Sequence, residues 1–252
     1  MERKKKKKCF TIRMTGKGFQ IENQYKLVCL NCKAYIDDNS GYDFAVSADR
    51  EDILEEKRMG SLECQRAGIN PGLDLWESLA IYRKIIRFLR KDNYIMMHGA
   101  VISTNNEGYM IAAPSGMGKT TRARIWMEQY PGSFIVNGDK PLIRVSDRGA
   151  YAWGTPWCGK EGWSRNSSVP LRAIYLLERA ERDSIEAIRP KEVIKELLPQ
   201  TFFPRDSEGV YDTIKLVNLM KNHVRVFRYR STMTAESVRM AYEAAQAAGP
   251  IG

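Results

Sequence analysis

A short glycine-containing motif, Ala113–Thr120 with the sequence APSGMGKT, constrains this chain more than any other feature. It follows the phosphate-loop pattern GxxxxGK[ST], except that alanine stands where the first glycine is usual. Gly116 and Gly118 allow the backbone to curl so that successive N–H groups face an anion. The apolar segment MIAA precedes the motif and a segment of helical character follows it, which is the order that such a loop requires.

The residues of this loop have separate expected roles. Lys119 is expected to contact the β- and γ-phosphates of a nucleotide, and the hydroxyl of Thr120 is expected to bind Mg²⁺. The helix after the loop adds the positive end of its dipole. The sequence therefore predicts that ATP or another polyphosphate binds through Pro114, Ser115, Gly116, Met117, Gly118, Lys119, Thr120 and Thr121.

The composition is typical of a globular chain. Hydrophobic residues make up 43% of the 252 residues and charged residues 28%, and no run approaches the roughly 18 apolar residues of a membrane helix. Five cysteines, an odd number, favour free thiols in a reducing compartment. We therefore expect a cytoplasmic protein without a membrane partner.

Much of the net charge of +10 is concentrated at the N-terminus, where MERKKKKK carries six positive charges and one negative charge. We interpret residues 1–8 as a solvated, disordered tail, as most such runs are. Binding of RNA or of an anionic surface is the alternative. Because aromatic residues are not interleaved with the lysines, the sequence does not favour a nucleic acid partner.

Two segments of different character follow the tail. Residues 9–92 contain the short strand patterns FTIRM, KLVCL and YDFAV, and then a helix over residues 70–91 that begins with Asp74 and Glu77 as an acidic capping pair. Residues 93–252 alternate between strands and helices, beginning with YIMMHGAVIS and GYMIAA as paired strands. The sequence thus predicts an α/β fold with a mixed β-sheet and an N-terminal β-rich segment.

Asp139 and His98 are further candidates for the site. Asp139 follows an apolar strand pattern about twenty residues after Lys119, where a carboxylate can meet Mg²⁺ or an attacking hydroxyl. His98 ends the apolar segment YIMM just before the loop. On general grounds, a histidine in an apolar strand is more often a core residue than a functional one.

Together, MHGAVI, APSGMGKTT and NGDKPLI resemble the nucleotide-binding core of HPr kinase/phosphorylase, over residues 94–145. That family phosphorylates a serine on a small carrier protein, and its core is similar to that of ATP-dependent phosphoenolpyruvate carboxykinase. The resemblance implies a P-loop kinase core of this type with the catalytic residues Asp139, His98 and Lys119. Asp139 would be the general base, His98 would orient it, and Lys119 would neutralise the transferring phosphoryl group.

Two features depart from the family pattern. The family has a pair of aspartates where this chain has Gly138-Asp139, so one metal-binding carboxylate is missing. The family's glutamate-bearing signature is replaced by GTPWCGKEGW, in which Glu161 is expected to supply that carboxylate, while Lys160 or the nearby Arg165 is expected to bind phosphate. The implied Mg²⁺ ligands are therefore Thr120, Asp139 and Glu161.

The sequence predicts an ATP- and Mg²⁺-dependent kinase that phosphorylates a hydroxyl, most of all a serine, on a peptide or small protein. The PWCGKEGW loop is similar to that of HPr kinase-related proteins that act on peptides. Two alternatives remain, namely a small-metabolite kinase and a nucleotide-binding regulatory protein without efficient turnover. The acceptor, the formation of a homo-oligomer and the use of pyrophosphate stay open.

Overall fold

The computed structural model describes residues 8–66, 68, 70–114 and 116–249, apart from the side chains of residues 62, 63 and 66. The chain forms two compact units, Met1–Phe88 and Leu89–Gly252. The boundary expected from the sequence, between residues 92 and 93, stays a prediction. Of the expected basic tail, residues 1–7 lie outside the described residues, and Lys8 begins the first strand.

The N-terminal unit contains a three-stranded sheet with the strand order β1-β2-β3. β1 (Lys8–Met14) and β2 (Lys17–Asn23) form an antiparallel hairpin, and β3 (Phe44–Ser47) pairs with β2 in parallel. Thr15 and Gly16 between β1 and β2 have φ angles of +56° and +80°, the left-handed conformation that a tight hairpin turn requires. Two of the three strands expected in this unit are therefore present.

The prediction of a third strand at KLVCL was wrong, because these residues lie in the helix α1 (Lys26–Cys32). The 3-10 helix η1 (Lys33–Tyr35) follows it. Val28 and Cys32 are buried four positions apart, while Leu30 between them is 66% exposed. Burial therefore follows the period of a helix and not the alternation of a strand.

The longer helices of this unit are α2 (Arg50–Arg66) and α3 (Leu73–Leu89), which ends one residue beyond the unit. Glu77 was expected to cap the start of α3, but it is buried. Its carboxylate accepts hydrogen bonds from the backbone N–H groups of Gln24 and Tyr25, at 2.6 and 2.9 Å. This contact holds the chain just before α1.

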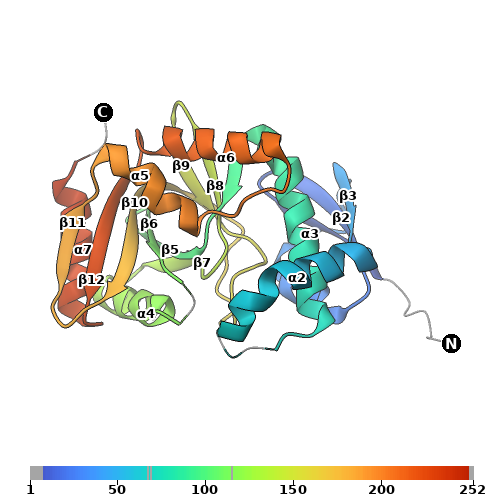
Figure 1. The fold of residues 1–252 in the computed structure, drawn as a ribbon, viewed down its shortest axis with the longest axis horizontal. Coiled ribbons are helices and arrows are strands. Elements are labelled where there is room, and N and C mark those ends of the chain that lie inside the picture. The colour runs from blue at the N-terminus through green and yellow to red at the C-terminus, as the bar shows by residue number, and fades with distance from the viewer. Residues whose placement is uncertain (1–7, 67, 69, 115, 250–252) are drawn as a thin grey trace. The chain divides into compact units, whose positions relative to one another are not determined.

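The C-terminal unit is built on a mixed sheet of nine strands, which confirms the expected α/β class (Figure 1). Seven strands follow one another in the order β4-β8-β9-β10-β6-β5-β7, while β12 pairs with β10 and β11 pairs with β12. β6, β10 and β12 are parallel, and the other neighbours are antiparallel. The strands are β4 (Tyr94–Met96), β5 (Gly99–Thr104), β6 (Glu107–Ala112), β7 (Phe134–Asn137), β8 (Leu142–Ser146), β9 (Gly149–Trp153), β10 (Ser168–Arg179), β11 (Ser184–Ala187) and β12 (Arg225–Ser231).

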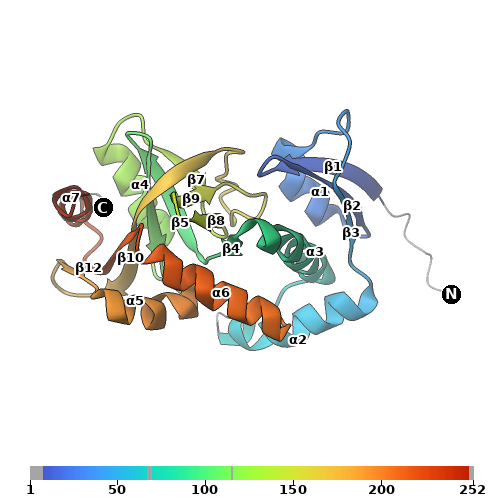
Figure 2. The same ribbon diagram turned by 90° about the horizontal axis from the view of Figure 1, so that it is seen from above.

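Helices cover both faces of this sheet. Side chains alternate along β10, so that Ala173, Tyr175 and Leu177 belong to one core cluster while Ile174 and Leu176 belong to the other. α4 and α7 pack on the first cluster, and α5 and α6 pack on the second (Figure 2). Their bounds are α4 (Lys119–Gln129), α5 (Pro190–Leu197), α6 (Ser207–Met220) and α7 (Ala235–Ala247), with the 3-10 helices η2 (Arg90–Asp92) and η3 (Leu198–Gln200). In the described part of the chain, none of the helices has the length and apolar character needed to cross a bilayer.

The paired strands expected before the glycine loop are present with one difference. β5 and β6 are antiparallel neighbours, and Asn105 and Asn106 between them have φ angles of +52° and +64°, as in a two-residue hairpin turn. The segment YIMMHGAVIS does not form one strand, because it breaks at Met97 and His98. β4 then pairs with β8, whereas β5 pairs with β6 and β7. His98 is therefore in a connection and not in an apolar strand.

Candidate functional site

The pairing of three strands brings His98, the glycine loop and Asp139 to one edge of the sheet. β5 runs antiparallel to both β6 and β7, so the start of β5 lies beside the ends of the other two. Gly99 pairs with Ala112, and its backbone N–H donates to the carbonyl of Asp139 at 2.9 Å. His98 directly precedes β5, the loop follows β6, and Asp139 follows β7. Three segments that are distant in the sequence therefore meet.

Two residues of the glycine loop have a left-handed backbone. Gly116 and Gly118 have φ angles of +78° and +91°, which other residues adopt only with strain. Gly118 directly precedes the 11-residue helix α4, so the N–H groups at the start of that helix border the loop. Pro114, Gly116 and Thr121 are exposed, Met117 and Thr120 are half-buried, and Ser115 lies outside the described residues.

Lys119 is the first residue of α4, and its ammonium group folds back over the loop. Only 8% of the residue is exposed. Its Nζ donates to the carbonyls of Ala113 and Pro114 at 2.7 and 3.1 Å, and it lies 3.4 Å from Nε2 of His98. The positive charge of Lys119 is thus held beside the loop. An anion bound there would replace the two carbonyl groups as the partner of the ammonium group.

Arg122, one turn further along α4, is a buried residue that the sequence patterns did not reveal. Its Nη1 donates to the carbonyls of Met117 and Gly118 at 3.0 and 3.3 Å. Its Nη2 and Nε donate to the carbonyl and the hydroxyl of Ser231 at 2.9 and 3.1 Å. Burial lowers the pKa of Arg122 from its ordinary value. The residue ties the loop to the end of β12.

The carboxylate of Asp139 is held by two side chains. Oδ1 lies 3.0 Å from Nε2 of His98, and Oδ2 contacts Nζ of Lys140. Burial acts to raise the pKa of this carboxyl group, but the hydrogen bond from His98 and the charge of Lys140 outweigh it. The pKa of Asp139 therefore lies below its ordinary value, and the group is ionised at neutral pH.

Two buried residues, Asn137 and Thr155, fix the turn that carries Asp139. Oδ1 of Asn137 accepts hydrogen bonds from the backbone N–H groups of Asp139 and Lys140 at 2.9 and 2.8 Å. Its Nδ2 donates to the carbonyl and the hydroxyl oxygen of Thr155, both at 3.0 Å. Neither residue was expected at the site, although an asparagine that bonds to the backbone two residues on is a known signal of a turn.

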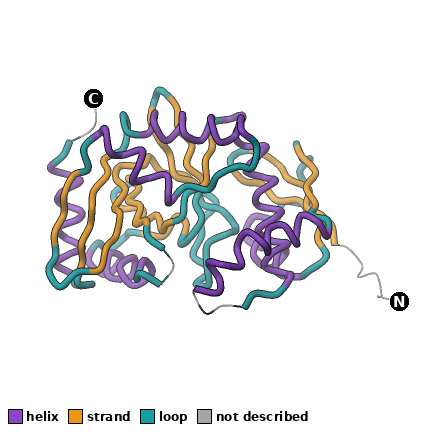
Figure 3. Tube along the Cα trace, viewed as in Figure 1, coloured by secondary structure: helices purple, strands orange, loops and turns teal. Residues whose placement is uncertain are grey.

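The irregular connection between β9 and β10, residues 154–167, lies against the end of β7 (Figure 3). The backbone N–H of Gly138 donates to the carbonyl of Trp163 at 2.9 Å, and that of Arg165 donates to the carbonyl of Val136 at 3.0 Å. β7 ends the strand order and pairs with β5 on one side. The connection therefore takes the place of a neighbouring strand on the other side.

This connection also brings Glu161 close to Asp139. A Cβ atom at Gly159 would lie 3.3 Å from Cβ of Asp139 and 3.7 Å from Oε2 of Glu161, so both side chains border this glycine. Lys160 is exposed. The guanidinium of Arg165 lies over the ring of Phe134, at 4.0 Å from the centre of the ring. Across the described residues, no three His, Cys, Asp or Glu side chains are grouped so as to hold a metal ion by themselves.

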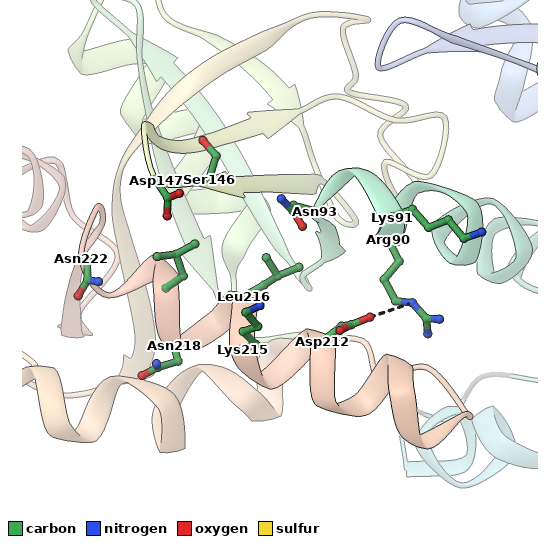
Figure 4. A pocket seen from close by; sticks show the side chains of 11 residues that line it. Arg90, Lys91, Asn93, Ser146, Asp147, Asp212, Lys215, Leu216, Asn218 and Asn222 are labelled. Carbon is green, nitrogen blue, oxygen red and sulfur yellow. Dashed lines mark ion pairs between the residues drawn. The ribbon is translucent and has the colours of Figure 1, made fainter.

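A separate pocket of about 590 Å³ lies between η2, the turn from β8 to β9, and α6 (Figure 4). Arg90 at this pocket is held by the carboxylates of Asp206 and Asp212, with nitrogen–oxygen distances of 2.7 and 3.5 Å. None of the residues expected at the site from the sequence lines it. Its lining consists of Arg90, Lys91, Asn93, Ser146, Asp147, Asp212, Lys215, Leu216, Asn218, Leu219 and Asn222.

Comparison with known proteins shows the family of this chain. No curated protein matches the chain. A family model described as SynChlorMet cassette protein ScmC matches residues 72–199, a segment that contains the glycine loop, Asp139 and the connection with Glu161. Since this match takes in half of the chain, the protein belongs to the SynChlorMet cassette protein ScmC family.

Proposed function

We propose that this protein is an ATP- and Mg²⁺-dependent kinase with a P-loop kinase core of the HPr kinase type. Its acceptor is a hydroxyl, most of all a serine, on a peptide or small protein. The observation that carries the proposal is the group formed by Lys119, His98 and Asp139, in which Nε2 of His98 lies 3.0 Å from Asp139 and 3.4 Å from Lys119. The resemblance of residues 94–145 to HPr kinase/phosphorylase adds support.

The loop suits a triphosphate. Two glycines with positive φ, the start of α4 and the ammonium of Lys119 together offer N–H donors and positive charge. Mg²⁺ prefers a few carboxylate or hydroxyl oxygens and completes its coordination with phosphate and water. Thr120, Asp139 and Glu161 are oxygen donors of that kind, and they would hold the ion. When bound, Mg²⁺ would neutralise charge on the phosphates.

In the proposed reaction, the serine hydroxyl attacks the γ-phosphorus of ATP. A bond forms between the serine oxygen and phosphorus, the bond from phosphorus to the bridging oxygen breaks, and ADP leaves with those electrons. Asp139 receives the hydroxyl proton, and His98 fixes the orientation of its carboxylate. Because the pKa of Asp139 is lowered, proton transfer is favourable only after the new bond has largely formed, which suits a loose transition state.

One observation favours a second candidate, the nucleotide-binding regulator without efficient turnover. Oδ2 of Asp139 is in contact with the ammonium of Lys140. An acceptor hydroxyl must approach this carboxylate beside Lys140 or displace it. A regulator would keep this ion pair closed and bind the nucleotide without transfer.

Phosphoryl transfer from radiolabelled ATP with Mg²⁺ into a size-fractionated host lysate distinguishes these functions. Label on a small polypeptide with the wild type supports the proposal, and label in the small-molecule fraction favours a metabolite kinase. Asp139→Asn should retain ATP binding and lose transfer by about 10²–10⁴-fold. Lys119→Ala should lose nucleotide binding. ATP binding without transfer to any fraction would overturn the kinase in favour of the regulator.

A further inference from the structure

The strand β10 ends at the same edge of the sheet as the glycine loop. β6, which leads into the loop, pairs with β10 in parallel, so that Ala112 lies opposite Leu176. β12 pairs with the other side of β10 (Figure 1). In this pairing, Arg179 at the end of β10 lies opposite Ser231. The carboxyl ends of parallel strands are where ligands bind in open α/β sheets. Arg179 therefore lies on the edge that carries the loop.

Arg179 contacts the loop through one donor. Its Nη2 donates to the carbonyl of Gly116 at 2.7 Å, and the residue is exposed. A guanidinium group carries five N–H donors, so most of them remain for a ligand. Within the described residues, no carboxylate forms an ion pair with Arg179.

Three cationic side chains from two elements converge on this loop. Lys119 donates to the carbonyls of residues 113 and 114, Arg122 to those of residues 117 and 118, and Arg179 to that of residue 116. Burial is the main cause that lowers the pKa of Arg122, and the positive charge of Arg179 lowers this pKa further. The two cations are therefore close enough to repel each other. An anion bound at the loop would relieve this repulsion.

We propose that Arg179 binds the phosphate groups of the nucleotide from the side of β10, while Lys119 binds them from the start of α4. This role rests on the proposed function, since it takes the ligand of the loop to be a nucleoside triphosphate. A guanidinium suits it, because its planar fork matches two phosphate oxygens. The hydrogen bond to Gly116 holds the side chain at the loop before the ligand binds.

Arg179 has a competing role, in which it only stabilises the loop through the hydrogen bond to the Gly116 carbonyl. Two substitutions separate this role from phosphate binding. Arg179→Gln keeps an amide that can donate to this carbonyl but removes the charge. Arg179→Lys keeps the charge and loses the fork. Arg182→Gln changes an exposed residue shortly after β10 and is the matched control for the change in net charge.

Calorimetric titration of the full chain with MgATP and with inorganic tripolyphosphate tests the proposal. Arg179→Gln should weaken both affinities by about 10- to 100-fold, the range expected for a lost hydrogen-bonded charge contact. The affinities of Arg179→Lys should lie between those of the wild type and those of Arg179→Gln. Arg182→Gln should bind both ligands as the wild type does. The melting temperature without ligand should not change. Equal affinities of the wild type and Arg179→Gln overturn the proposal, and so does an equal loss in Arg182→Gln.

The same variants separate this role from the proposed function. A wild type that binds tripolyphosphate more tightly than Arg179→Gln does, but transfers no phosphoryl group, supports the role of Arg179 and overturns the kinase. A wild type that transfers the group, with an Arg179→Gln variant of equal MgATP affinity, overturns the role of Arg179 alone. Failure of the folded wild type to bind either anion overturns both.

Discussion

Nε2 of His98 lies 3.0 Å from Oδ1 of Asp139 and 3.4 Å from Nζ of Lys119. A neutral imidazole carries its proton on one nitrogen, and the hydrogen bond to the carboxylate requires that proton on Nε2. The contact between His98 and Lys119 then joins two donors and is not a hydrogen bond. One nitrogen thus borders both the ammonium of the loop and the carboxylate of the proposed base.

His98 should act on the rate of transfer and not on nucleotide affinity. His98→Ala leaves Oδ1 of Asp139 without this donor, so the carboxylate loses its orientation. We expect kcat to fall by about 10- to 100-fold with an unchanged KM for ATP, as for other residues that orient a functional group. His98→Gln, which can still donate, should restore part of the rate. Steady-state kinetics check this, with His223→Gln, at the other histidine, as the control that should retain full activity.

Asp139 should contribute stability that depends on pH. Its pKa is lower in the folded chain than the value of about 4 in an unfolded one, so the contribution is complete above pH 4. It is lost as the pH falls from about 4 toward the folded pKa. The difference in the free energy of unfolding between the wild type and Asp139→Asn should therefore narrow in acid. Urea unfolding at pH 7 and at about pH 3.5 measures it, and a constant difference would contradict the lowered pKa.

Arg122 should be needed for the loop to fold. Arg122→Ala removes the side-chain donors of the carbonyls of Met117 and Ser231, while the carbonyl of Gly118 keeps the backbone N–H of residue 122 as a donor. Each group left unsatisfied costs about 1–3 kcal/mol. We expect the free energy of unfolding to fall by about 3 kcal/mol or more. Arg124→Ala on the same helix removes an exposed guanidinium that lies over the ring of Trp163, and it should cost about 0.5–1 kcal/mol. Equal losses in urea unfolding would argue against the buried role of Arg122.

Gly159 and Gly162 form a matched pair for testing the approach of the β9–β10 connection to Asp139. Both have positive φ, +85° and +67°, so alanine at either position should cost about 1 kcal/mol of stability. A Cβ at Gly159 meets Asp139 at 3.3 Å, whereas one at Gly162 meets nothing within 4 Å. Gly159→Ala should therefore slow transfer, and Gly162→Ala should not. Measured rates that fall together would show that backbone strain alone is responsible.

Local patterns in the sequence predicted the alternation of strands and helices in the C-terminal unit. They did so because buried residues alternate with more exposed ones along strands such as β9, and because hairpin turns contain characteristic residues. β11 was not expected, since its residues SIEA are half-buried or exposed and show no alternation. This strand exists through its pairing with β12.

The residues that hold the site in place were harder to predict, because their partners are distant in the sequence. Arg122 and Ser231 are 109 positions apart, and Arg179 and Gly116 are 63 positions apart. No short pattern records such contacts. The helix α1 shows the same limit, since valine and cysteine favoured a strand there and tertiary packing decided for a helix.

The connection of residues 154–167 forms backbone hydrogen bonds along the side of β7 that has no neighbouring strand among the described residues. These bonds limit where sequence can be inserted into the protein. An inserted tag or epitope there would pull on the strand that leads to Asp139 through the backbone bonds at Val136 and Gly138. The exposed turn at Asp147 and Arg148 has no such connection to β7 and is the better place for added sequence. The length of this connection thus helps to fix the position of Asp139, in addition to the side chains that the connection carries.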